Sequence, residues 1–180
     1  MNKQFPVRDV TYIAAAAALI AACAWISVPA DPPFTLQTFA IFFAVGLLGG
    51  RRGTLALVVY LLLAAAGLPV LAGFRGGLGA LLGTTGGYLL GFLVADLLLW
   101  ASEKLPLPEK TRLPLGMLVG LLSCYAFGTV WFVRVYAQNT GAIGYGAALA
   151  RCVLPFVIPD LLKIAAALAL IPRVRKLIRL

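Results

Sequence analysis

The stretch PFVIPDLLKIAAALALIP, residues 155–172, decides the fold class of this chain. It is apolar over nearly the length that an α-helix needs to cross a bilayer, roughly 20 residues. Yet Asp160 and Lys163 lie within it, and Pro155 and Pro159 come before them. An ionisable side chain at the bilayer centre costs about 2.5–3.5 kcal/mol on insertion scales. We therefore expect the stretch to lie in a membrane and its charged residues to serve a function.

The rest of the chain is apolar in the same way. Of its 180 residues, 62% are hydrophobic and 12% are charged, about half the charge of a soluble domain. We predict an all-α integral membrane protein, a single domain of six transmembrane helices. The first apolar run is too long for a signal peptide and no small-residue cleavage site follows it, so we expect it to be retained. The predicted spans are Val10–Val28, Gln37–Leu48, Thr54–Leu71, Leu81–Trp100, Leu113–Ala137 and Ala148–Ile171.

Lysine and arginine residues predict the orientation. An even number of spans puts both termini on one side, and cytoplasmic loops carry the excess of these residues. With both termini cytoplasmic, in a bacterial cytoplasmic membrane, only Arg75, Arg134 and Arg151 fall outside. The net charge of +9 then reflects topology and attraction to anionic membrane lipid, not binding of nucleic acid. The residues predicted inside are Lys3, Arg8, Arg51, Arg52, Lys104, Lys110, Arg112, Arg173, Arg175, Lys176 and Arg179.

The residue types exclude several kinds of chemistry. The chain has no histidine and six carboxylates, so we predict neither a transition-metal site nor a His-based catalytic triad. The spacing of its three cysteines suits neither zinc nor a disulfide framework. The sequence lacks GxxxxGK[ST], so the chain does not hydrolyse ATP itself. We predict a protein that is not an enzyme and that carries no cofactor.

Asp160 and Lys163 project from nearly the same face of a helix, because they are three residues apart. Three interpretations are open. The two side chains neutralise each other and only orient the helix; they form a proton or sodium relay with Asp96, the only other acid in a span; or they bind a ligand. A carboxylate acceptor beside an ammonium donor suits a small molecule with N–H groups next to a carbonyl. We favour the ligand site, because apolar residues would serve stability better than a buried pair.

Two predicted outer connections complete this site. The loop Pro29–Leu36 leads into Gln37, which is either a ligand contact or an ordinary polar residue at a helix end. The connection Gly67–Gly83 is too apolar for a free loop and too rich in glycine for a helix, so we expect a lid over the cavity. Arg75 at its centre is either a partner for an anionic group of a ligand or a solvated surface residue.

Small residues recur at four-residue spacing, which lets helices approach closely in lipid. Gly83, Gly87 and Gly91 form one such stripe, and we expect most of these stripes to pack the bundle together. Ala14 and Ala18 lie in a smooth alanine run on the first span, which also suits contact with another subunit.

Four stretches together resemble the BioY family, the biotin-specific substrate-binding subunits of energy-coupling factor (ECF) vitamin transporters. The resemblance covers nearly the whole chain, in order and at similar spacing. Its most specific part is GLPVLAG…GGLG…GGY, followed much later by PDLLK. The stretches are PFTLQTFA (Pro33–Ala40), GRRGTLALVVYLLLAAAGLPVLAG (Gly50–Gly73), GGLGALLGTTGGYLLGF (Gly76–Phe92) and PFVIPDLLK (Pro155–Lys163).

The resemblance implies a ligand, a fold and partners. Members have six helices, cytoplasmic termini and a vitamin pocket near the outer face, closed by the first and third loops. It implies that Asp160 accepts from the ureido N–H groups of biotin, that Lys163 donates to the ureido oxygen, and that Tyr88 of GGY belongs to the binding residues. Ala14 and Ala18 match the stripe that docks on the transmembrane coupling subunit, which works with two cytoplasmic ATPases.

The sequence departs from the family at two points. Leu89 follows the tyrosine of GGY, where some members carry an arginine suited to the biotin carboxylate, so Arg75 becomes the candidate for that role. Pro159 stands where many members have glycine. We predict a high-affinity biotin-binding subunit that captures biotin outside and mediates its uptake. The alternatives are a subunit for another vitamin, a solitary small-molecule transporter, an intramembrane enzyme and a passive scaffold.

Overall fold

The computed structural model describes residues 6–29 and 32–178, which form a bundle of helices with two short strands. Lys3 and Arg179, predicted to face the cytoplasm, and positions 30 and 31 of the first predicted loop lie outside the described residues. The long helices are α1 (Val7–Trp25), α2 (Gln37–Leu48), α3 (Gly50–Ala65), α5 (Gly86–Ser102), α6 (Glu109–Asn139) and α8 (Leu154–Ile178). The short elements are β1 (Ser27–Val28), β2 (Phe34–Thr35), η1 (Ala72–Phe74), α4 (Leu78–Leu82) and α7 (Tyr145–Cys152).

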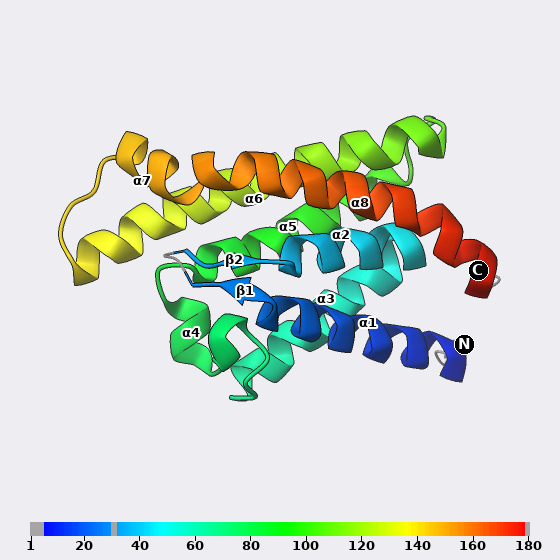
Figure 1. Ribbon diagram of the computed structural model, residues 1–180, viewed down its shortest axis with the longest axis horizontal. Coiled ribbons are helices and arrows are strands. Elements are labelled where there is room, and N and C mark those ends of the chain that lie inside the picture. The colour runs from blue at the N-terminus through cyan, green and yellow to red at the C-terminus, as the bar shows by residue number, and fades with distance from the viewer. Residues whose placement is uncertain (1–5, 30–31, 179–180) are drawn as a thin grey trace.

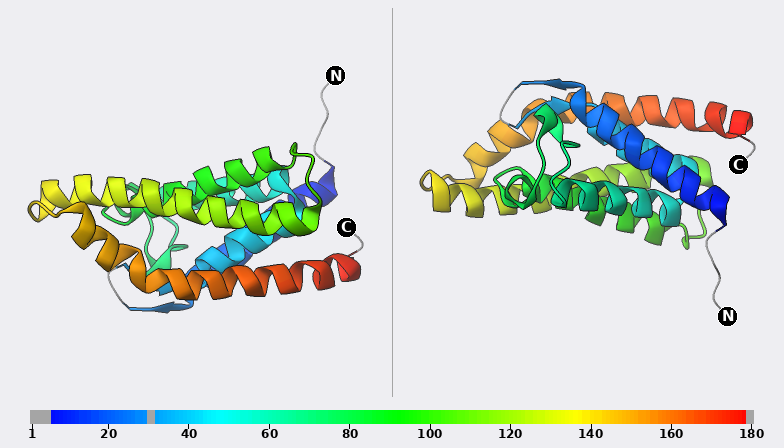
Figure 2. Two further views of the ribbon diagram at one scale, coloured as in Figure 1. Left: turned by 90° about the horizontal axis from the view of Figure 1, so that it is seen from above. Right: turned by 90° about the horizontal axis from the view of Figure 1, so that it is seen from below.

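Most of the long helices run along the length of the molecule, and the start of α1 and the end of α8 lie at one end (Figures 1 and 2). α5 packs along α6, and α2 contacts α1, α3, α5 and α8. The antiparallel β1–β2 hairpin, α4 and α7 gather at the opposite end. We call these two ends of the bundle the termini end and the hairpin end.

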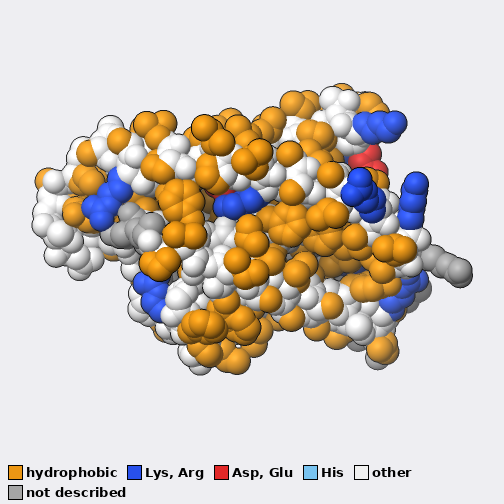
Figure 3. Space-filling model, in the orientation of Figure 1, with side chains coloured by type: hydrophobic (Ala, Val, Ile, Leu, Met, Phe, Trp, Pro, Cys, Tyr) orange, Lys and Arg blue, Asp and Glu red, His pale blue; other side chains and the backbone are white. Residues whose placement is uncertain are grey.

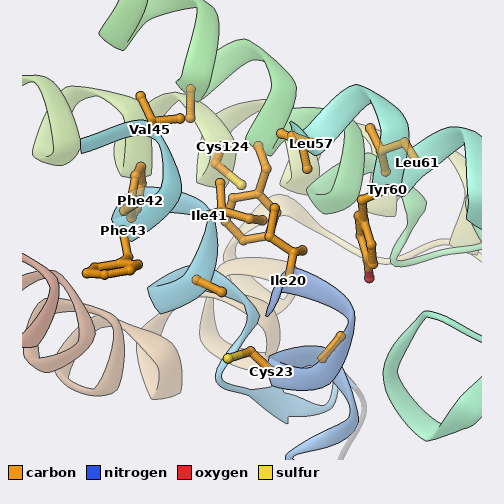
Figure 4. Packing of buried hydrophobic residues seen from close by; sticks show 14 of the residues in the cluster. Ile20, Cys23, Ile41, Phe42, Phe43, Val45, Leu57, Tyr60, Leu61 and Cys124 are labelled. Carbon is orange, nitrogen blue, oxygen red and sulfur yellow. The ribbon is translucent and has the colours of Figure 1, made fainter. Parts of the chain in front are cut away.

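The burial of α2 explains why so short an apolar segment is stable. Every residue from Ala40 to Gly46 is buried, and a helix that is apolar on all sides belongs in an interior. Ile41 and Phe42 belong to one enclosed cluster with Ile20 of α1 (Figure 4). Neighbouring helices therefore separate most of α2 from lipid.

The surface of the bundle is apolar where a bilayer would meet it. Hydrophobic side chains cover much of the face in Figure 3, and several Lys and Arg side chains gather near the termini. Leu118 and Leu122 on α6 and Ile158 and Leu162 on α8 are among the exposed hydrophobic residues. α1, α6 and α8 are each long and apolar enough to cross a membrane, and α2 and α5 are shorter apolar helices. The chain is therefore a helical membrane protein.

Glycines shift the ends of two predicted spans. The third, Thr54–Leu71, corresponds to α3, which ends at Ala65. Gly67 follows with a φ of 94°, which glycine adopts without strain and which ends the helix. The fourth, Leu81–Trp100, is divided, because α4 ends at Leu82 and α5 begins only at Gly86. The β1–β2 hairpin has no counterpart in the predicted all-α fold.

The last predicted span, Ala148–Ile171, consists of two helices (Figure 1). α7 ends at Cys152 and α8 begins at Leu154, with Val153 between them outside either helix. Pro155 has no amide donor, which is tolerated in the first turn of a helix, so the helix restarts there. Pro159 lies inside α8. The predicted single span is thus interrupted at Val153, just before Pro155.

Charged residues hold the corner between α2 and α3 at the termini end. Arg175 of α8 donates from Nη1 to Glu109 of α6 at 2.6 Å and from Nη2 to the carbonyl oxygen of Gly46. Glu103 accepts a hydrogen bond from the amide of Gly50 at 2.6 Å. The arginine thus satisfies a C-terminal carbonyl of α2, and the carboxylate satisfies an N-terminal amide of α3. We call these contacts the corner clamp.

Candidate ligand-binding site

A cavity opens at the hairpin end, lined by residues of α2, α5, α6 and α8. Its empty volume is about 800 Å³ with the open space at its mouth included. The hairpin and the segment from Gly67 to Gly77, which we call the lid, also contribute to its lining. The predicted connection Gly67–Gly83 was wrong in its last part, because Leu78–Leu82 form the short helix α4. All the residues predicted to contact a ligand line this cavity. They are Gln37, Arg75, Tyr88, Asp160 and Lys163.

Asp160 and Lys163 meet on the wall of the cavity. Lys163 Nζ lies 2.7 Å from Asp160 Oδ1, and Asp160 is 4% exposed. A carboxylate has about four acceptor positions, so the ion pair leaves Asp160 with capacity for the donors of a ligand. The two side chains thus pair with each other and also line a cavity.

Tyr125 is a lining residue that the sequence analysis missed. Its hydroxyl donates to Asp160 Oδ2 at 2.8 Å, and it lines the cavity. The bond joins α6 to α8, so it helps to hold the acid in place. Tyr125 lies in a long apolar run with no motif around it. The only signal in the sequence is its hydroxyl, since a buried tyrosine usually finds a hydrogen-bond partner.

Gln37 belongs to a chain of hydrogen bonds that continues into the lid. Its Nε2 donates to the hydroxyl of Tyr60 at 3.2 Å, and that hydroxyl donates to the carbonyl oxygen of Val70 at 3.2 Å. Tyr60 is fully buried. The hydrogen bond to Tyr60 uses one N–H group of the Gln37 side-chain amide. Gln37 therefore retains its side-chain carbonyl oxygen and a second N–H group for a ligand. Gln37 therefore connects the cavity to the lid.

Arg75 and Tyr88 contribute further polar groups. Arg75 is exposed, and its Nε donates to the carbonyl oxygen of Ala72 at 3.2 Å. This bond holds the side chain within the lid while leaving the two terminal nitrogens as donors. The hydroxyl of Tyr88 shares a 3.1 Å hydrogen bond with Thr129 Oγ1. Leu89 also lines the cavity, so this position presents only apolar surface.

Aromatic rings supply much of the apolar wall. Phe92 of α5 and Phe156 of α8 line the cavity. Phe34 of β2 stacks on Phe156, with ring centres 4.1 Å apart and planes 12° apart. This contact ties the hairpin to α8 near Asp160. A small polar cluster among apolar walls is the arrangement that small-molecule pockets generally have.

Ala14 and Ala18 do not line the cavity. Both are exposed on α1, as is Ala22, whereas Ala17 and Ile20 of the same helix are buried. The alanine stripe therefore lies on the outside of the bundle. Another subunit or lipid can reach it there.

Comparison with known proteins identifies the family. The family model described as BioY family matches residues 1–180. This chain belongs to the BioY family. The family assigned from its sequence motifs is thus confirmed.

Individual BioY proteins match the chain over most of their length. The biotin transporter BioY of Thermotoga maritima is 40% identical over 162 residues, which are 89% of this chain and 91% of that protein. The probable biotin transporter BioY of Pyrococcus horikoshii is 36% identical over 169 residues, 93% of this chain and 96% of that protein. These relatives are named as transporters, which supports the prediction that this BioY chain is not an enzyme.

A solved crystal structure also matches this chain. The crystal structure of the S-component for biotin from an ECF-type ABC transporter has a TM-score of 0.80 to this chain at 26% sequence identity. The match covers 98% of this chain and 95% of the solved one. The helical architecture predicted from the sequence is therefore that of an ECF S-component.

Proposed function

We propose that this chain binds biotin on the outer side of the membrane and mediates its uptake as the S-component of an ECF transporter. The observation that carries the proposal is the Asp160–Lys163 pair on the wall of a cavity in a BioY-family protein. Proteins that match it over about nine-tenths of their length are named biotin transporters, and a similar solved structure is an S-component for biotin.

The functional groups of biotin match the lining of the cavity. The ureido ring offers N–H donors to Asp160 and a carbonyl oxygen to Lys163. The apolar ring system packs against the aromatic wall. The carboxylate extends toward the lid, where Arg75 is its charged partner. Gln37 and Tyr88 supply further hydrogen-bonding groups around the ligand.

In the proposed topology all six long helices cross the membrane, with both termini in the cytoplasm. Three of them are long enough by themselves, and the other three pack against them. Both termini lie at the same end (Figure 1), which an even number of crossings requires. The cavity lies at the opposite end and therefore opens outward. Lys and Arg at the termini end face the anionic lipid of the cytoplasmic leaflet.

The proposed partners are a transmembrane coupling subunit and two cytoplasmic ATPases. The chain has no ATP-binding motif of its own, so uphill uptake requires hydrolysis elsewhere. The exposed stripe with Ala14 and Ala18 is the proposed docking surface, because small residues let a helix of another subunit approach closely in lipid.

Binding of labelled biotin to the purified chain tests the proposal. We expect saturable binding at nanomolar to micromolar biotin that unlabelled biotin displaces and other vitamins do not. Mass spectrometry of the small molecule that co-purifies with the chain provides an independent identification. Absence of biotin binding, or stronger displacement by another vitamin, overturns the assignment.

Asp160→Asn tests the role of the acid. The amide keeps the size of the side chain but leaves Lys163 without its charge partner, and loss of one member of a buried pair is costly. We expect biotin affinity to fall by about 100-fold, with helix content retained. Asp9→Asn is the matched control, because Asp9 forms a 2.7 Å ion pair with Arg52 at the termini end and should leave affinity unchanged. If Asp160→Asn and Asp9→Asn bind biotin with the same affinity, Asp160 does not have the proposed role in binding.

A further inference from the structure

The lid is attached to the bundle at closely spaced ends. Gly67 and Gly77 have φ of 94° and 89°, and their amides donate to the same carbonyl oxygen, that of Ala64, at 3.0 Å and 2.7 Å. A Cβ atom at either glycine would meet no described atom within 4 Å. The segment is thus a compact loop whose two ends meet at the end of α3. No side chain packs against the two glycines, whereas Val70 and Leu71 within the loop are buried.

Two side chains fasten neighbouring carbonyl groups of the lid. Trp25, the last residue of α1, donates from Nε1 to the carbonyl oxygen of Pro69 at 2.8 Å. Tyr60 of α3 donates to the carbonyl oxygen of Val70 at 3.2 Å. Its ring belongs to the apolar cluster, and its hydroxyl points away from the other labelled side chains (Figure 4). Two different helices therefore hold adjacent residues of the same loop.

Trp25 makes a second contact with the lid. Its ring stacks on Phe74, with ring centres 5.3 Å apart and planes 27° apart. Phe74 has a φ of 56°, which is uncommon for a bulky residue, and such strain persists only where the surroundings impose it. Because Phe74 is 65% exposed, burial does not impose it. Phe74 lies in a turn that the amide of Leu71 closes by donating to the carbonyl oxygen of Arg75 at 3.0 Å, and its ring contacts Trp25.

We propose that Trp25 and Tyr60 form a latch that determines how long a ligand stays in the cavity. This inference rests on the proposed function, because Leu71, Ala72 and Arg75 of the lid line the cavity and would contact a ligand bound there. Gln37 links the latch to the site, since it lines the cavity and donates to the Tyr60 hydroxyl. Val70 and Leu71 of the lid are buried in the apolar core cluster, so opening must break the two hydrogen bonds of the latch together with these apolar contacts. Loss of a latch hydrogen bond therefore lowers the free-energy cost of opening.

Of the two latch residues, Trp25 belongs to α1. Trp25 ends the helix whose exposed face, with Ala14 and Ala18, is the proposed docking surface. The lid is anchored on α3 at Ala64, so a tilt of α1 relative to α3 draws Trp25 away from Pro69. Docking of a partner on α1 thereby acts on the lid through the contacts of Trp25 with Pro69 and Phe74.

Dissociation of labelled biotin from the purified chain, chased with excess unlabelled biotin, tests the latch. Trp25→Phe removes the indole N–H and keeps an aromatic ring; Tyr60→Phe removes only the hydroxyl. We expect each to raise the dissociation rate about five- to tenfold, and to change the association rate less than twofold. Tyr12→Phe is the matched control, because its hydroxyl accepts a hydrogen bond from Arg8 near the start of α1. It should dissociate at the wild-type rate.

Hydrogen exchange of the ligand-free chain gives a second measurement. We expect the amides of residues 67–77 to exchange faster in both latch variants, while those of α2 and α6 keep their protection. The latch is overturned if a folded Trp25→Phe protein releases biotin at the wild-type rate and its lid amides also exchange at the wild-type rate. This surface variant, 41% exposed, decides the matter even if Tyr60→Phe does not fold. If the wild-type chain binds no biotin, the proposed function fails, and exchange of the lid amides still tests the latch.

Discussion

Each carboxylate oxygen of Asp160 accepts one hydrogen bond, from Lys163 on the same helix and from Tyr125 on α6. These donors hold the acid in one orientation before any ligand arrives. A site arranged in advance loses less conformational entropy on binding. The polar end of the cavity is therefore rigid, whereas its other charged group, Arg75, belongs to a loop.

Arg75→Gln should weaken biotin binding about fivefold to tenfold, because it removes one charged partner of the carboxylate at an exposed position. The same substitution should not affect the affinity for biotin amide, which lacks that charge. Equilibrium binding of both ligands to both proteins forms a double-mutant cycle. Arg134→Gln is the control, since Arg134 is exposed and does not line the cavity. If Arg75→Gln lowers the affinity for biotin and for biotin amide equally, Arg75 does not pair with the biotin carboxylate.

Asp96 of α5 is fully buried, and neither carboxylate oxygen has a hydrogen-bond partner among the described residues. Burying an unpaired polar group costs about 1–3 kcal/mol. We expect Asp96→Ala to raise the free energy of unfolding by about 1 kcal/mol, as measured by denaturation in detergent. Biotin affinity should stay unchanged, because Asp96 does not line the cavity. A less stable variant shows that the acid has a partner or a role that the packing does not reveal.

At the scale of elements, glycines set the distance between α5 and α6. A Cβ on Gly91 would lie 3.0 Å from the carbonyl oxygen of Cys124, and one on Gly120 would lie 3.1 Å from the Cβ of Ala95. These small residues pack the bundle, as their spacing predicts. Gly128 of α6 differs, because a Cβ there would overlap the ring of Tyr88.

Gly128→Ala should therefore lower both stability and biotin affinity. The added methyl group displaces Tyr88, and overpacking of this kind costs about 1–3 kcal/mol. Thermal unfolding and equilibrium biotin binding measure the two effects. Gly146→Ala is the control, since no described atom lies within 4 Å of its added Cβ. If affinity survives in Gly128→Ala while stability falls, Tyr88 does not contact the ligand.

Helices were more predictable than the contacts between them. A membrane requires long apolar helices, so apolar length alone locates Gln37–Leu48, which coincides with α2. The hairpin and the break at Val153 depend on packing between distant segments, such as Phe34 on Phe156, and local sequence does not encode that. The charged site residues were conspicuous because charge is rare in a span. Tyr125 was not, because nothing local distinguishes it from a tyrosine that only packs.

At the scale of the whole molecule, the ligand cavity and the alanine stripe are separate surfaces. Ala18→Trp should leave biotin binding to the purified chain unchanged, because the residue is exposed on α1 and does not line the cavity. It should abolish co-purification of the coupling subunit, since a large side chain prevents close approach of helices. Ala166→Trp, at an exposed alanine of α8, is the control. Retained co-purification in Ala18→Trp places the docking surface elsewhere.

The corner clamp has a consequence for the route by which biotin reaches the cytoplasm. Arg175, Glu109 and Glu103 join α8, α6 and α5 to both sides of the α2–α3 corner, so a passage through the termini end requires several charged contacts to break together. The contacts of the corner clamp can stay intact if biotin leaves the cavity through the same opening by which it entered. We therefore expect the entire protein to reorient within the bilayer, presenting one mouth first to the exterior and then to the interior of the cell.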